Sequence, residues 1–119
     1  MRFAIYLVAL CVPLGGPATA GEQALPAFPG AEGFGAVAVG GRGGRVIRVT
    51  NRKPAGPGSF AAALGAKGPR IIVFDVSGVI PAAGGKYARY RLGDGHVTIA
   101  GQTAPGPGIT VEGQLWFRG

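Results

Sequence analysis

Acidic residues, cysteine and histidine are all scarce in this chain. Its 119 residues include 5 Asp and Glu, one histidine (His96) and one cysteine (Cys11). A lone cysteine excludes an internal disulfide. Because calcium takes about 6 to 8 oxygen ligands, the few scattered carboxylates do not indicate a dedicated calcium site. His96 has no serine or aspartate partner that spacing identifies, so we interpret it as structural.

The first 20 residues have the pattern of a secretion signal. Arg2 supplies the positive end, an apolar run follows at 3–14, and Ala18-Thr19-Ala20 is a small-x-small cleavage site. The run is shorter than the roughly 20 apolar residues of a membrane span, and Leu10 before Cys11 does not fit a lipidation site. We therefore expect cleavage after Ala20, loss of Cys11, secretion to the periplasm or the exterior, and no stable membrane anchor.

Positive charge predominates, with a net charge of +7 at pH 7. Such a balance favours an acidic partner, namely nucleic acid, an anionic surface or a uronic-acid polymer, and a merely basic soluble surface is an equal alternative. The Arg-Gly-Gly segment at 40–45 is typical of nucleic-acid binding, but it occurs once and follows a secretion signal, so we expect no nucleic-acid partner. The densest cationic and aromatic stretch could contact a polyanionic sugar, although a solvated loop is favoured there. It comprises Lys86, Tyr87, Arg89, Tyr90 and Arg91.

Glycine and proline are abundant, with 24 and 10 residues, but their order indicates turns between short strands. β-Branched or aromatic runs bounded by these residues predict strands at 46–50, 70–76, 97–100, 109–112 and 115–117. One short helix is predicted at 60–64, with Ser59 as its N-cap and Gly65 ending it in the left-handed conformation. Hydrophobic pattern alone leaves a repeating β coil, a sandwich and a barrel open.

Six ordered blocks of this sequence resemble the start of the pectate lyase-like proteins (polysaccharide lyase family 1). The longest are AFPGAEGFG at 27–35, IVFDVSG at 72–78 and TIAGQTAPG at 98–106, and the others lie at 40–46, 49–51 and 56–59. The resemblance implies a mainly β fold, a right-handed parallel β-helix, represented here by an amino-terminal cap with one short helix and the first coils. It divides the chain into a signal peptide, 1–20, and an incomplete β-helix domain, 21–119. Gly101, Gly106, Gly108 and Gly113 would form the corners between sheets at positive φ.

The resemblance also implies β-elimination of polygalacturonate-type uronans. In that family, calcium ligands and an arginine base lie on later coils, so we expect calcium for the full-length protein and none in this chain. No catalytic, cofactor-binding or metal-ligating residue is assigned. We expect the chain to be inactive and incomplete, because it stops at 114–119 within a strand, and the full-length protein to be a monomer acting on acidic polysaccharide. A non-catalytic domain that binds acidic polysaccharide is the alternative, and a purely structural β-helix piece is a third possibility.

Three carboxylates are possible metal ligands, but each has a more ordinary interpretation. Asp75 follows an apolar run, which favours a hydrogen-bonded strand end over a metal ligand. Asp94 lies between two glycines, a pattern typical of a turn. Glu112 follows Val111 at the end of a strand pattern, and we expect it to point outward into solvent.

Overall fold

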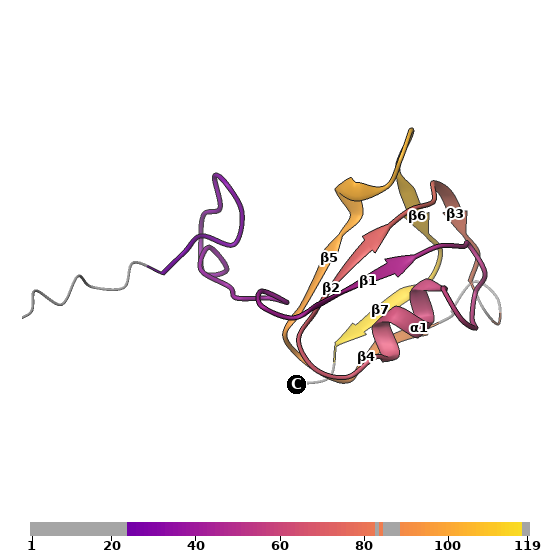
Figure 1. Cartoon of the computed structure of the whole chain (residues 1–119), viewed down its shortest axis with the longest axis horizontal. Coiled ribbons are helices and arrows are strands. Elements are labelled where there is room, and N and C mark those ends of the chain that lie inside the picture. Colours follow the sequence, from indigo (N-terminus) through magenta and orange to yellow (C-terminus); the bar gives the residue numbers. More distant parts are fainter. Residues whose placement is uncertain (1–23, 83, 85–88, 118–119) are drawn as a thin grey trace, which may run out of the picture.

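The computed structural model describes residues 24–82, 84 and 89–117, so the predicted signal at 1–20 lies outside the described residues. Within this range the chain is mainly strand with one short α-helix (Figure 1). In chain order the elements are β1 (Arg45–Val49), α1 (Phe60–Gly65), β2 (Arg70–Phe74), β3 (Gly78–Ile80), β4 (Arg89–Leu92), β5 (Val97–Ala100), the 3₁₀ turn η1 (Gly101–Thr103), β6 (Ile109–Val111) and β7 (Gln114–Phe117).

The strands form three small sheets in which all described pairs are parallel. Their orders are β1-β2-β5, β3-β6 and β4-β7. The chain passes through β2, β3 and β4, and then β5, β6 and β7 pair with these same strands in the same order (Figure 1). Each sheet therefore contains one strand from each of these two successive passes of the chain, and the first sheet also contains β1.

The five strands predicted from β-branched and aromatic runs are confirmed, with ends that shift by at most two residues. The structure adds two strands that the runs did not indicate, β3 and β4. The expectation of a solvated loop was wrong for Arg89–Leu92, which is strand β4. Its side chains alternate between exposed arginines and the more buried Tyr90 and Leu92, because successive side chains of a strand point to opposite faces.

The core lies between the three sheets and α1. Strand β2 contributes Ile72 and Phe74 with alternating burial, as expected for a strand with one face toward the core. The Phe60 ring of α1 lies 5.6 Å from the Phe74 ring and 5.4 Å from the Tyr90 ring, centroid to centroid. The other members of the buried cluster are Val49, Ala63, Leu64 and Ile80.

The helix begins as predicted but ends differently. Ser59 is the N-cap, and its hydroxyl accepts a hydrogen bond from the Ala62 amide at 3.2 Å. Gly65 was expected to end the helix in the left-handed conformation, and this is wrong, because Gly65 is the last helical residue and is not among the glycines with positive φ. The chain instead leaves the helix in the extended conformation at Ala66.

A buried arginine, and not a glycine cap, provides hydrogen-bond donors for the carbonyl groups at the end of the helix. The Arg70 side chain is fully buried and donates hydrogen bonds to the carbonyls of Ala63, Leu64 and Gly68 at 3.2, 2.7 and 2.8 Å. The last carbonyls of a helix lack partners within the helix, and a cation near them also interacts favourably with the helix dipole. Arg70 thereby joins the start of β2 to the end of α1.

Glycines are required at two kinds of position. Gly106, Gly108 and Gly113 have positive φ, as expected for corners between sheets, whereas Gly101 does not and instead starts η1. In the Arg-Gly-Gly segment, a Cβ on Gly41 would overlap the Arg70 carbonyl group. Gly41 thus packs directly against the backbone at the start of β2, where a side chain would not fit.

Candidate polyanion-binding face

Asp75 lies directly after β2 and is bound by an arginine of the neighbouring strand. Arg48 donates from Nε to Oδ2 at 2.7 Å and from Nη2 to Oδ1 at 2.9 Å. These hydrogen bonds hold the pKa of Asp75 below its usual value, against the opposing effect of desolvation and with a smaller contribution from the Arg48 charge. Both carboxylate oxygens are therefore used within the sheet.

Asp94 connects two loops. Its Oδ2 accepts a hydrogen bond from the Gly68 amide at 3.1 Å, and its Oδ1 lies 3.5 Å from Lys67 Nζ. The Gly68 hydrogen bond is the main reason that the pKa of Asp94 is lowered, with the Lys67 and Arg70 charges adding to it. The predicted turn position holds, but the partners of the carboxylate belong to the loop before β2.

Glu112 and His96 are both exposed and lie in the turns after β6 and before β5. His96 has φ of 57°, which is uncommon for a residue with a side chain, and its carbonyl accepts a hydrogen bond from the Arg70 amide. Across residues 24–82, 84 and 89–117, no three His, Cys, Asp or Glu side chains gather as metal ligands would. With Asp75 and Asp94 already bonded to cationic or amide donors, the described residues do not fit a calcium site.

The cationic and aromatic stretch is divided by the structure. Lys86 and Tyr87 lie outside the described residues. Tyr90 is not available for stacking on a sugar, because it is 6% exposed and packs against Phe60. Burial, and to a smaller extent the Glu112 charge, raises the pKa of the Tyr90 hydroxyl. Only Arg89 and Arg91 of this stretch are placed on an exposed face.

The aromatic partner of these arginines comes from β7 and was missed in the sequence. Parallel pairing sets Arg89 opposite Gln114 and Arg91 opposite Trp116, and side chains at paired positions lie on the same side of a sheet. The Arg89 guanidinium carbon lies 4.3 Å from the centre of the Trp116 ring. Trp116 Nε1 donates to Gln114 Oε1 at 3.2 Å. We call Arg89, Arg91, Gln114 and Trp116 the Arg–Trp face.

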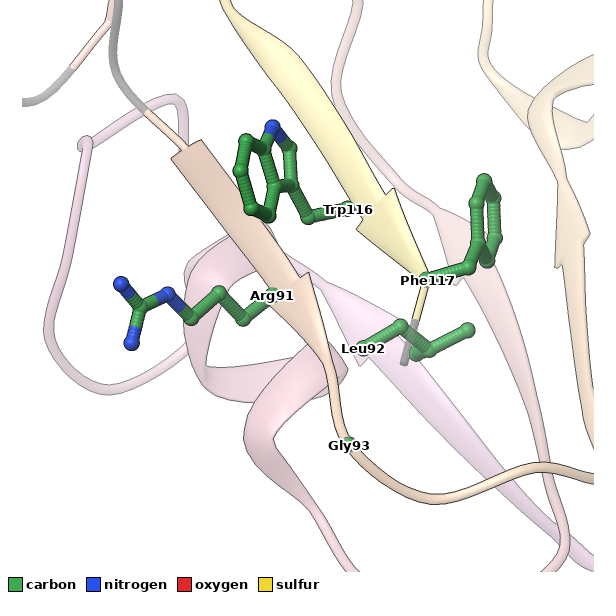
Figure 2. Close-up of a pocket in the computed structure, with 5 residues that line it drawn as sticks. All are labelled: Arg91, Leu92, Gly93, Trp116 and Phe117. Atoms are coloured by element: carbon green, nitrogen blue, oxygen red, sulfur yellow. The ribbon is translucent and has the colours of Figure 1, made fainter. Parts of the chain in front are cut away.

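A hollow of about 420 Å³ lies where β4 and β7 end, lined by Arg91, Leu92, Gly93, Trp116 and Phe117. Figure 2 shows Arg91 and Trp116 directed to one side of the two strands, and Leu92 and Phe117 to the other. The hollow therefore combines an arginine with aromatic surface.

No helix in the described part of the chain is long and apolar enough to cross a membrane.

Comparison with known proteins gives several strong sequence matches. The chain is 54% identical over 93 residues to a protein of Neosartorya fischeri named "Probable pectate lyase C", a match that covers 78% of this chain and 21% of that protein. Proteins with the same name from Emericella nidulans and Aspergillus oryzae are 52% identical over 100 residues and 53% identical over 94 residues, covering 84% and 79% of this chain and 22% and 21% of those proteins. The chain is pectate lyase-like in sequence.

This pectate lyase-like chain spans about a fifth of the length of the curated relatives that it matches. A comparison with protein-family models finds no match. The resemblance seen in the six sequence blocks is thus confirmed by the relatives named pectate lyase. The matched region is about a fifth of each of those relatives.

Proposed function

We propose that this chain is the amino-terminal part of a secreted lyase that cleaves polygalacturonate-type uronans by β-elimination. The observation that carries the proposal is the identity of 52 to 54% with proteins named pectate lyase over more than three quarters of the chain. In β-elimination, a base removes the proton α to the uronate carboxylate. The electron pair of that C–H bond forms a carbon–carbon double bond as the glycosidic oxygen leaves.

The same proposal gives the chain a definite architecture, the cap and first coils of a right-handed parallel β-helix. Three observations support it, namely the parallel sense of all described strand pairs, the repeated visit to each sheet in the same order, and the helix packed beside β1 and β4. In this arrangement the segment supports later coils that stack on β5, β6 and β7.

Several charged side chains of the described part of the chain are already engaged within the fold. Asp75 and Asp94 are bonded to cations or amides, and Arg70 is buried against helix carbonyls. We therefore propose that the base, and any calcium ligands, belong to parts of the protein outside the described residues, and that this segment alone is inactive.

The alternative, a non-catalytic domain that binds acidic polysaccharide, is favoured by one observation, the exposed Arg–Trp face. The test is to read the source DNA past the codon of Gly119, express the protein of the whole reading frame, and incubate it with polygalacturonate. A lyase produces unsaturated uronate ends that absorb in the ultraviolet. Retention on the polymer with unchanged polymer length supports the alternative, and neither signal supports a purely structural role.

A further inference from the structure

We propose that the Arg–Trp face binds the carboxylated sugar units of an acidic polysaccharide. The choice of a uronan as the ligand rests on the proposed function. The site itself rests on the geometry of β4 and β7, which pairs residues 25 positions apart in the sequence.

The two arginines present cationic groups to solvent. Tyr90 fills the core between them, so Arg89 and Arg91 project from the opposite side of β4. In the described part of the chain, the ion pairs are Arg48–Asp75 and Lys67–Asp94, and neither involves this face. Two arginines on alternate positions of one strand are separated by roughly 7 Å, which allows each to bind a different carboxylate.

Stacking on Trp116 prepares Arg89 for a carboxylate. A guanidinium that lies over an aromatic ring uses its flat face, and its N–H groups remain directed outward in the plane. These donors match the two oxygens of a carboxylate. Trp116 is itself held by the hydrogen bond to Gln114, which limits the freedom of the ring.

The neighbouring hollow can accept a sugar ring. Its volume of about 420 Å³ lies within the range of ligand sites, about 300 to 1,000 Å³. Trp116 is 46% exposed and lies on the same side of the strands as Arg91 (Figure 2), so its ring surface is available to the C–H groups of a sugar. Arg91 also lines this hollow. Its positive charge favours a sugar that carries a carboxylate over a neutral sugar.

The test uses the 119-residue chain, in which Trp116 is the only tryptophan and reports binding by its own fluorescence. Polygalacturonate is titrated at low salt into the unaltered chain, Arg91→Gln, the double variant Arg89→Gln/Arg91→Gln, and Lys53→Gln. Lys53 is exposed and lies before α1, so its variant removes one charge from elsewhere on the surface. Because a hydrogen bond to a charged group contributes about 1.5 to 3 kcal/mol, we expect binding to weaken by about 10-fold or more in Arg91→Gln. We expect the affinity of Lys53→Gln to fall by less than about 2-fold, as for loss of an exposed charge without a specific partner.

Three results overturn the inference. The first is an equal loss of affinity in Lys53→Gln and Arg91→Gln, which indicates general charge attraction. The second is undiminished binding of a fully methyl-esterified polymer, which lacks the carboxylate charge. The third is equal binding of single-stranded DNA, which indicates an unselective polyanion surface.

The same variants are compared in the protein of the whole reading frame by retention on immobilised polygalacturonate, so the test does not depend on independent folding of the chain. Ultraviolet absorbance of cleavage products is followed in parallel. Weakened retention in the double variant of a protein without lyase activity supports the inference and refutes the proposed function. Unchanged retention of the double variant in an active lyase refutes the inference and supports the proposed function.

Discussion

Replacing Arg70 should loosen the junction between α1 and β2 more than any other single change at that junction. Arg70→Met keeps much of the buried volume but removes all three hydrogen bonds to the carbonyls of Ala63, Leu64 and Gly68. Ala63 and Leu64 are buried, so their carbonyls cannot easily recover a partner from water. An unsatisfied buried acceptor costs about 1 to 3 kcal/mol, and two of them give an expected loss of about 2 to 6 kcal/mol.

That loss is large beside a total stability of about 5 to 15 kcal/mol for a typical domain. Arg70→Lys should recover part of it at most, because a single ammonium group replaces a planar fork that reaches three carbonyls. Arg45→Met is the matched control, since Arg45 pairs with Arg70 across β1 and β2 but is exposed. We expect a change within about 0.5 kcal/mol there, as for other surface substitutions.

The assay is amide hydrogen exchange of α1 together with urea unfolding followed by circular dichroism. A loss of 3 kcal/mol corresponds to about 150-fold faster exchange through local opening of the helix, at about 1.4 kcal/mol for each factor of ten. If the amides of α1 exchange as slowly in Arg70→Met as in Arg45→Met, the proposed role of the buried arginine is refuted.

Three further predictions concern the cap, a close backbone contact and a lowered pKa. Ser59→Ala removes the N-cap hydrogen bond to the Ala62 amide and should cost about 0.5 to 2 kcal/mol in urea unfolding, whereas an unchanged midpoint would show that the cap is dispensable. Gly41→Ala places a Cβ against the Arg70 carbonyl, and this overpacking should lower stability by about 1 to 3 kcal/mol, with thermal unfolding as the measurement and an unshifted midpoint as the contrary result. The folded-state pKa of Asp94 is lowered, so its stabilising contribution is complete above the ordinary aspartate pKa, about 3.9, and is lost as the pH falls through the lower folded value. The stability difference between the unaltered chain and Asp94→Asn should therefore shrink below about pH 4, and a difference that grows there would contradict the assignment.

The sequence predicts much of the strand content because a strand is indicated by its own residues and by the turn residues beside it. Runs such as 70–74 are β-branched and end at turn residues, and Ser59 is an N-cap by its own chemistry. Strand β4 was missed because its alternation is carried by Tyr90 and Leu92 between arginines, and a charged segment of that kind also suits a loop. Its burial depends on Phe60, a residue of another element.

The candidate face could not be predicted because it depends on register between distant strands. Arg89 and Trp116 meet only because β4 and β7 pair in parallel with Arg91 opposite Trp116. The same limit applies to Arg70, which is a single arginine at the start of a strand in the sequence. Its role is defined by helix carbonyls that become neighbours when α1 packs beside β1 and β4.

The central claim is that this segment belongs to a lyase that acts on uronans by elimination. The most direct test is the product of polygalacturonate incubated with the protein of the whole reading frame. We expect ultraviolet absorbance from unsaturated uronate ends to rise in step with the number of new chain ends. New reducing ends without that absorbance would indicate hydrolysis, and the absence of new chain ends would show that the protein does not cleave the polymer, so either result would contradict the account.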